Sequence, residues 1–264
     1  MIVEALLLTK NFNSDDLKFW IDWHLNKCKF DRLHIIDNES YIDIPEIIKN
    51  DVRITYENVK GYARQYVLYD TYINEKSNAD WIIPIDDDEY LDFENNFKSV
   101  QDLLKFYSTI HKDLHLFAIR WKHLFPKDFK EKRNGRNIFE YCTEENYKIA
   151  NLFSLGDFGV KTFVKRDGII HYQETWENPS GGHVPLHSKQ PFGALLSDGE
   201  KIVKNYSTNL YHTTELVRLL HCRYKGPDDW DFKYNNLNYV SDKINKTRYR
   251  DTKFNEFIKN DYYK

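Results

Sequence analysis

The segment Trp81-Ile82-Ile83-Pro84-Ile85-Asp86-Asp87-Asp88-Glu89-Tyr90-Leu91 contains an apolar run followed by four consecutive acids. An apolar run of this length, bounded by polar sequence, is typical of a strand that is buried on both faces of a sheet. The acids are then expected at the carboxyl end of that strand. In open α/β sheets, this is the edge at which ligands bind.

The four adjacent carboxylates repel one another, and a divalent cation that prefers hard oxygen ligands, Mg²⁺ or Mn²⁺, would relieve that repulsion. Alternate side chains of a turn can reach one ion, whereas neighbouring side chains tend to diverge. This favours Asp86 and Asp88 as the metal-binding pair, with Asp87 and Glu89 as the alternative. A solvated acidic turn without a ligand is the competing interpretation.

The chain upstream of the acids alternates between predicted strands and helices. The strands are expected at residues 2–9, 33–36 and 52–56, and the helices at residues 14–27, with Ser14 as the N-cap, at residues 45–49 and at residues 61–76. Strands that alternate with helices predict an α/β fold with a mainly parallel sheet and right-handed crossovers. The strand ends at Lys10, Asp37 and Asp86 would then lie along one rim.

The chain downstream of the acids is less regular. We expect a helix at residues 99–110, a strand at 114–121, a mobile loop or insertion at 125–150, and two short strands at 159–165 and 169–172 joined by a turn. Residues 174–200 are expected to form loops, residues 213–225 a helix, and the tail beyond residue 232 to be helical in part. The predicted domain is residues 1–226, divided at residue 125, with a C-terminal helical elaboration at 227–264.

Composition excludes some classes of partner. The 264 residues carry 38 basic and 41 acidic side chains, a net charge of −3, so no global field favours nucleic acid.

The three cysteines are widely spaced and odd in number, which favours a reduced protein without disulfides. Glu4 stands where a signal peptide has basic residues, and the N-terminal apolar segment is far shorter than the ~20 residues of a membrane span. A soluble, cytoplasmic protein is therefore expected.

Four segments in this order resemble the GT-A glycosyltransferases, in the branch similar to families 2 and 92. The segments are Lys10-Asn11, Trp20-Ile21-Asp22-Trp23-His24, His34-Ile35-Ile36-Asp37-Asn38-Glu39-Ser40, and Ala79-Asp80-Trp81 leading to the acids and Tyr90-Leu91. A looser resemblance continues through residues 120–125, 161–164 and 221–226, so that it covers most of residues 2–226. Phe12 stands where the family usually has an acid.

The resemblance implies a GT-A fold, which is a Rossmann-like fold of nucleotide-diphospho-sugar transferases, and a donor site. Asp86 and Asp88 would belong to a site for a nucleotide sugar and Mn²⁺ or Mg²⁺, with Asp87 beside them, and Asp37 would lie near the base or ribose. Lys10, Arg64 and Gln65 are further candidates for contacts with the nucleotide. A solvated helix face is the alternative for Arg64 and Gln65.

Histidines and further acids could complete the site. His183 follows two glycines, which let the backbone approach a phosphate, and its imidazole could join a shell of oxygen ligands. His221 is a second candidate metal ligand, and Arg223, two residues on, could contact a diphosphate. An ordinary hydrogen-bonded histidine is the alternative for both.

A reaction with inversion at the sugar would also need a base for the acceptor hydroxyl. Glu174 and Glu177, in an aromatic segment, are the candidates, with Asp228 and Asp229 as rivals.

The sequence thus predicts a metal-dependent glycosyltransferase that moves a sugar from a nucleotide diphosphate donor, expected to be UDP-linked, to a hydroxyl acceptor, expected to be a glycan. The first alternative is a nucleotidyltransferase, which would need a glycine-rich phosphate loop after the first strand, whereas residues 8–12 contain no glycine. The second is a sugar-binding or nucleotide-binding module without catalysis.

Overall fold

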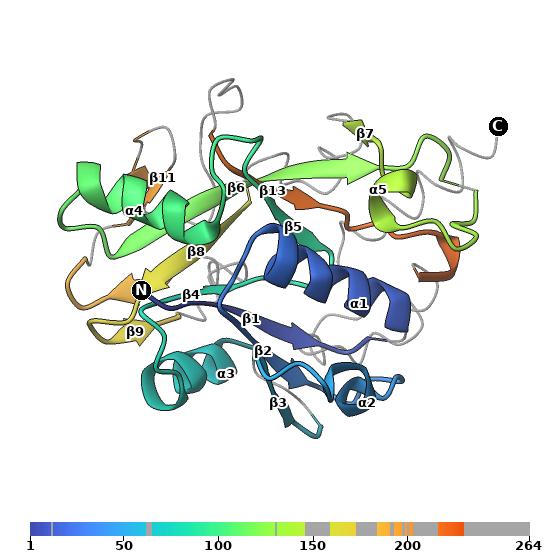
Figure 1. The fold of residues 1–264 in the computed structure, drawn as a ribbon, viewed down its shortest axis with the longest axis horizontal. Coiled ribbons are helices and arrows are strands. Elements are labelled where there is room, and N and C mark those ends of the chain that lie inside the picture. Colours follow the sequence, from blue (N-terminus) through green and yellow to red (C-terminus); the bar gives the residue numbers. More distant parts are fainter. Residues whose placement is uncertain are drawn as a thin grey trace.

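A curled, mixed sheet forms the centre of the molecule in the computed structural model (Figure 1). The structure describes residues 1–11, 13–61, 65–129, 131–145, 159–172, 184–190, 193–196, 199, 201–202 and 216–229. The first half contains β1 (Val3–Thr9), α1 (Ser14–Asp22) with a π-helical turn η1 (Trp23–Lys27), β2 (Arg32–Asp37), α2 (Ile44–Ile48), β3 (Ile54–Asn58), α3 (Gln65–Thr71) with a π-helical turn η2 (Tyr72–Lys76), and β4 (Trp81–Pro84). This alternation of strands and helices agrees with the predicted order.

The second half is richer in strands. It contains β5 (Glu89–Asp92), α4 (Val100–Ile110), β6 (Leu116–Phe125), α5 (Ile138–Tyr141), β7 (Glu144–Glu145), β8 (Val160–Lys165), β9 (Ile170–His171), β10 (Leu186–His187), β11 (Ala194–Leu196), β12 (Lys201–Ile202) and β13 (Arg218–His221).

The main sheet has the order β12-β11-β6-β8-β4-β1-β2-β3. Strands β3, β2, β1, β4, β6 and β11 run in one direction, and β8 and β12 run against them. The predicted α/β class with a mainly parallel sheet is therefore confirmed. A separate ladder joins β13 to β5 and β6, so the strand that follows the acids pairs with the last strand that the structure describes.

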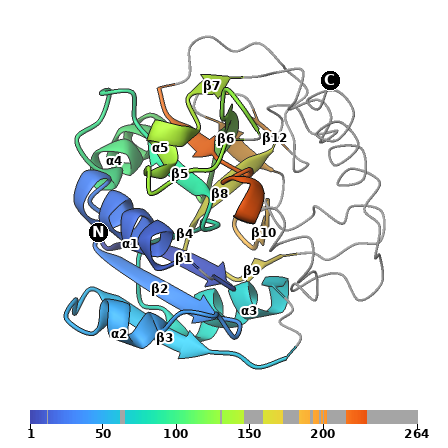
Figure 2. The same cartoon turned by 90° about the vertical axis from the view of Figure 1, so that its right-hand side faces the viewer.

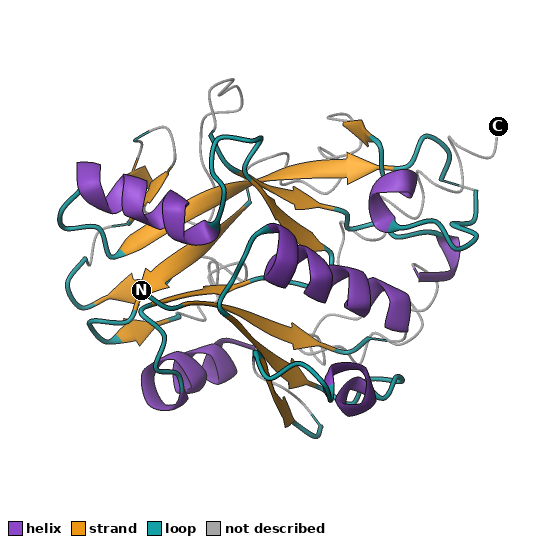
Figure 3. Cartoon of the chain, in the orientation of Figure 1, coloured by secondary structure: helices purple, strands orange, loops and turns teal. Residues whose placement is uncertain are grey.

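Helices cover both faces of the sheet because the strands are apolar on both sides (Figure 3). Val3, Ala5 and Leu7 of β1 belong to the core that α1 and α4 cover. Leu6 and Leu8 belong to the opposite core, which α3 covers. Figure 2 shows α1 and α4 on one side of the sheet and α3 on the other.

The parallel register brings three strand ends to one rim, as the sequence predicted. Thr9 at the end of β1 is opposite Asp37 at the end of β2, and Leu6 is opposite Pro84 at the end of β4. The segments that follow these strands, including the acids at residues 86–88, therefore leave the sheet at the same edge.

Several local predictions are wrong. Asn13, rather than Ser14, is the N-cap of α1, because its side chain accepts hydrogen bonds from the backbone N–H groups of Asp15 and Asp16. Part of the predicted helix at residues 213–225 is the strand β13, which pairs with two other strands. Pairing with distant strands overrides local periodicity in such a short segment.

Other loop predictions also need correction. Part of the segment predicted as mobile, residues 125–150, is packed, since Ile138 and Tyr141 of α5 are buried and Asn137 caps that helix. The region predicted as loops, residues 174–200, contains β10 and β11. Strand β9 pairs with β10 instead of β8. The predicted C-terminal helical elaboration falls mostly on residues 230–264, outside the described residues.

Candidate functional site

Residues 86–88, here called the acidic turn, connect β4 to β5 at the rim. The indole N–H of Trp20 on α1 donates to the Asp86 carbonyl over 3.0 Å. The backbone N–H of Asp86 donates to Glu89 Oε2 over 2.8 Å, and the N–H of Glu89 donates to the Asp86 carbonyl over 3.1 Å. These bonds fix the backbone of the turn, so the directions of its side chains follow from the fold.

The Asp87 side chain points inward and holds the turn to two other segments. Its Oδ2 accepts from Thr9 Oγ1 over 3.0 Å and from Asn11 Nδ2 over 3.1 Å. Its Oδ1 lies 3.2 Å from Nζ of Lys225, which also donates to the Asp87 carbonyl over 3.1 Å. Both oxygens of Asp87 are thus engaged by the protein, which is the arrangement of an anchor.

The buried ammonium group of Lys161 pairs with the Asp86 side chain. Lys161 of β8 is only 2% exposed, and its Nζ lies 2.8 Å from Asp86 Oδ2 and 3.4 Å from Glu89 Oε2. Burial alone would lower the pKa of Lys161, but Asp86 and Glu89 outweigh it and raise this pKa above its usual value. Burial raises the pKa of Glu89 well above its ordinary value, although Lys161 opposes the shift. The Asp86 side chain itself stays 34% exposed.

Asp88 faces the other side of the turn, toward β13. Its Oδ1 lies 3.4 Å from Nε2 of His221, and its carbonyl accepts from the Cys222 N–H over 2.8 Å. The His221 ring packs against Trp121, with 4.6 Å between the ring centroids. The structure therefore brings together the two residues, Asp88 and His221, that the sequence suggested as metal ligands from distant segments.

Asp37 lies at the neighbouring strand end, but its carboxylate is also engaged. Oδ1 accepts from the Ser40 N–H over 2.8 Å, and Oδ2 accepts from Tyr56 Oη over 2.8 Å and from Asn58 Nδ2 over 3.0 Å. Asp37 thereby organises the wall of the rim between β2 and β3. Any contact of Asp37 with a nucleoside stays a prediction.

The other predicted residues that the structure describes lie at different places. Lys10 follows β1, with its Nζ 5.9 Å from the centroid of the Tyr41 ring. Gln65 begins α3 and donates to Tyr69 Oη over 2.7 Å. Arg223 is half-buried and lies two residues after the end of β13.

The two candidate acids near the end of the described chain differ in their surroundings. Burial lowers the pKa of Lys225, but the charges of Asp87, Asp16 and the buried Asp229 outweigh it and raise this pKa well above its usual value. Asp228 is exposed and pairs with Lys132 over 3.1 Å. Asp229 is therefore electrostatically coupled to the acidic turn through Lys225.

The remaining predictions fall on residues that the structure does not describe. These residues are Arg64, Glu174, Glu177 and His183. Their roles as donor contact, base and metal ligand stay predictions.

The sequence interpretation did not predict that two buried lysines, Lys161 and Lys225, compensate the acids. Lys161 stands between Val160 and the apolar residues Phe163 and Val164 in a buried strand, and Lys225 follows the buried Tyr224. A single lysine in a buried strand is costly unless it is paired, so it indicates a nearby carboxylate. That signal could have identified Lys161 as a partner of the acidic turn.

The side chains at the turn have the chemistry that a divalent cation requires. Asp86 and Asp88 offer hard oxygen ligands, and His221 offers an imidazole nitrogen. His221 Nδ1 is buried and has no hydrogen-bond partner among the described residues. These ligand types suit Mn²⁺ or Mg²⁺, but in this structure the ligand atoms of Asp86, Asp88 and His221 do not all lie within 4.8 Å of one another, and Lys161 already pairs with Asp86. A metal at the turn stays a prediction.

Among the described residues, the one group of three possible metal ligands whose ligand atoms lie close together is elsewhere, and it fits a metal poorly. His115, Asp167 and His187 have ligand atoms within 4.8 Å of one another. His187 Nε2 lies 2.8 Å from the Lys165 carbonyl, and its Nδ1 accepts from the Lys189 N–H over 3.1 Å. Because both ring nitrogens are engaged and burial lowers the pKa of His187, its imidazole is a neutral structural group.

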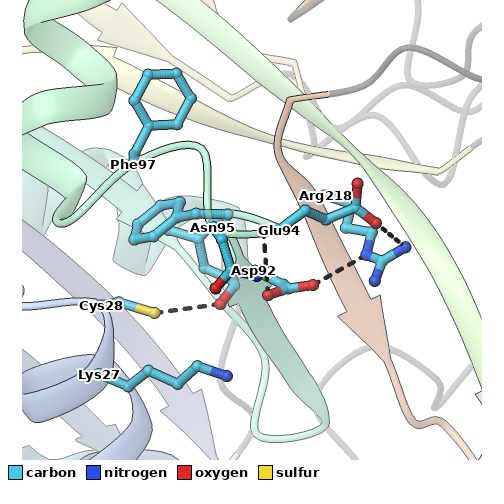
Figure 4. A pocket seen from close by; sticks show the side chains of 9 residues that line it. Lys27, Cys28, Asp92, Glu94, Asn95, Phe97 and Arg218 are labelled. Atoms are coloured by element: carbon cyan, nitrogen blue, oxygen red, sulfur yellow. Dashed lines mark hydrogen bonds and ion pairs between the residues drawn. The ribbon is translucent and has the colours of Figure 1, made fainter.

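A hollow of about 560 Å³ lies between η1, the end of β5 and β13 (Figure 4). Lys27 and Cys28 line one side, and Asp92, Glu94 and Arg218 line the other. Arg218 Nε donates to Asp92 Oδ2 over 3.0 Å and its guanidinium also pairs with Glu94. The acids of this hollow are thus paired internally, and the acidic turn is not part of its lining.

Comparisons with known proteins give only distant likenesses. No model of a known protein family matches the chain, and no curated protein matches it. Among solved structures, residues 1–349 of TarS from S. aureus align with 98% of this chain and 71% of their own length, at 13% identity and a TM-score of 0.45. The same residues of TarS in complex with UDP align with 98% of this chain and 72% of their own length, at 12% identity and a TM-score of 0.42.

A third structure is 4-diphosphocytidyl-2C-methyl-D-erythritol synthase from Anaerococcus prevotii, which aligns with 62% of this chain and 70% of its own at 13% identity and a TM-score of 0.34. At this distance the likenesses carry no conclusion about activity.

Proposed function

We propose that this protein is a metal-dependent glycosyltransferase that transfers a sugar from a nucleotide diphosphate donor, expected to be UDP-linked, to a hydroxyl acceptor. The observation that carries the proposal is the acidic turn at the rim of the parallel strands. The Asp86 side chain is 34% exposed, Asp88 is buried beside His221, and Asp87 anchors the turn to β1 and to Lys225. Carboxylates at this edge of an α/β sheet are suited to hold a cation and the diphosphate that the cation binds.

The residues of the turn have separate roles in this proposal. Asp86 and Asp88 hold the donor and its metal, with His221 as the third ligand, and Asp37 shapes the wall for the nucleoside. A bound Mn²⁺ or Mg²⁺ would supply positive charge to stabilise the departing diphosphate. If the sugar is transferred with inversion, Glu174, Glu177 or Asp229 accepts the proton of the acceptor hydroxyl.

The hydrogen bonds of the turn support a catalytic site more than a passive binding surface. The indole of Trp20 and the carboxylate of Glu89 hold the backbone before any ligand arrives. A preorganised site of this kind keeps charged groups in the geometry that a transition state needs, and it does not have to reorganise during the reaction.

The test is a screen for UDP release from UDP-linked sugars with Mn²⁺ present, run beside the variants D86A and D88A. We expect hydrolysis or transfer from at least one UDP-linked sugar, and a loss of about 100-fold or more in both variants, the scale of removing one preorganised electrostatic contact. Turnover that both substitutions leave unchanged would contradict the proposal. Metal-dependent UDP binding without turnover of any nucleotide sugar would favour the binding-module alternative.

A further inference from the structure

We propose that Lys161 is a positioning residue of the donor site, which holds Asp86 in the orientation that binds the donor and its metal. This inference rests on the function proposed above and adds a residue that lies within the sheet. Lys161 belongs to β8, the antiparallel strand between β4 and β6. It therefore acts on the turn from a different strand than the one that carries the acids.

The contacts of Lys161 divide the two oxygens of Asp86 between protein and solvent. Nζ of Lys161 lies 2.8 Å from Oδ2, and Oδ1 has no hydrogen bond or ion pair among the described residues. The side chain of Asp86 is 34% exposed, so a ligand can reach this carboxylate from the solvent. Lys161 thus fixes the carboxylate by one oxygen and leaves the other for binding.

The same ammonium aligns the backbone of the turn through Glu89. Nζ lies 3.4 Å from Glu89 Oε2, and this oxygen accepts the hydrogen bond from the Asp86 N–H. One buried cation therefore connects the side chain and the backbone of Asp86. If Lys161 were removed, both carboxylates would lose their compensating charge and Asp86 would be free to adopt other rotamers.

Stability alone does not explain a lysine at this position. Burying an ammonium and two carboxylates is costly, and apolar residues of similar volume are often as stable or more stable. Neighbouring positions of β8 are occupied by Val160, Phe163 and Val164, which are fully buried. The useful effect of the lysine is orientation, because a side chain held in its binding rotamer loses less entropy when the ligand arrives.

The experiment separates orientation from stability by compensating the charge. K161M alone leaves two uncompensated carboxylates and is expected to lose stability. K161M/E89Q removes one cation and one carboxylate together, so its stability should lie near that of E89Q. The matched control is K165M, on the same strand, where the lysine is partly exposed and its Nζ lies 3.2 Å from Asp167 Oδ2.

Two quantities are measured for each variant: the midpoint of urea unfolding, and the Kd of UDP in the presence of Mn²⁺ by calorimetry. We expect K161M/E89Q to unfold near E89Q and to bind UDP about tenfold to 100-fold more weakly, the usual effect of losing a hydrogen bond to a charged group. K165M should match the wild type in both. Binding by K161M/E89Q within threefold of E89Q would overturn the inference.

A second variant makes the test independent of whether the methionine variants fold. K161R keeps the charge but places it at a different distance from the strand, so a positioning role predicts weaker UDP binding with little change in unfolding. Unchanged UDP binding by K161R would overturn the positioning role. If the wild type itself does not bind UDP, the proposed function fails, whereas normal wild-type binding with normal binding in these variants refutes only the role of Lys161.

Discussion

The substitution D87A tests whether the middle acid of the turn is an anchor. Asp87 pairs with Lys225, which is 4% exposed, and it also accepts from Thr9 and Asn11. Its removal takes from the buried ammonium the carboxylate with the largest electrostatic effect on it, while Asp16 and Asp229 remain near. Breaking a buried pair costs about 3–5 kcal/mol, and the remaining carboxylates place this case toward the lower end. For a chain of this size, each kcal/mol lowers Tm by about 2–4 °C, so the expected decrease is about 6–20 °C.

The assay is thermal unfolding and urea unfolding, both followed by circular dichroism, with D80A as the control. The Asp80 side chain is 58% exposed and pairs with the N-terminal amine, a contact expected to contribute at most about 1 kcal/mol. We expect D80A to unfold close to the wild type and D87A to unfold at a much lower urea concentration. Equal unfolding midpoints for D87A and D80A would refute the assignment of Asp87 as an anchor.

Two further substitutions test the packing around the turn. Burial lowers the pKa of His24 from its usual 6.5 to about 3, so the unfolded chain binds a proton below about pH 6.5 that the folded protein does not. The stabilising effect of the neutral ring is complete above that pH and decreases by about 1.4 kcal/mol per unit as the pH falls toward 3. The stability of the wild type relative to H24F should therefore fall by about 2 kcal/mol between pH 6.5 and 5 in urea titrations, and a difference independent of pH would refute the assigned pKa. In G159A, the added methyl would lie 1.6 Å from Trp121 Cε3, and Trp121 packs against His221. We expect a loss of about 1–3 kcal/mol and weaker UDP binding, measured by urea unfolding and calorimetry, and wild-type values for both would contradict the packing.

The sequence was sufficient to predict the strand ends that meet at the rim of the sheet. The run from Trp81 to Ile85 is apolar without interruption, which is typical of a strand that is covered on both faces. Once the alternation of strands and helices indicated parallel strands, the ends at Thr9, Asp37 and the acids had to share one edge. The observed register confirms this part of the prediction.

The second half was harder to predict because its strands depend on distant partners. Arg218–His221 carries two adjacent leucines among polar residues, a pattern that both a helix and a strand can present. Its pairing with β5 and β6 decides the outcome, and that pairing spans more than 90 residues of chain. Sequence periodicity contains no information about such partners.

The division of roles within the acidic turn also depends on tertiary contacts. Nothing in three consecutive aspartates shows that the middle one is held by β1 and Lys225, that Asp86 pairs with Lys161, and that Asp88 is buried beside His221. The preference for Asp86 and Asp88 rested on the alternation of side chains, and the geometry is consistent with it. Their binding of a metal or a donor stays a prediction.

The measurement that tests the central proposal most directly is calorimetric titration of the protein with UDP, with and without Mn²⁺, in the wild type, D88N and H221Q. Asp88 lies in the acidic turn and His221 in β13, with 3.4 Å between Asp88 Oδ1 and His221 Nε2, so a shared ion should depend on both. We predict that UDP binds the wild type only when Mn²⁺ is present, and that each substitution weakens this binding about tenfold or more. Binding of UDP that is independent of Mn²⁺ and equal in all three proteins, or no binding to the wild type at all, would contradict it.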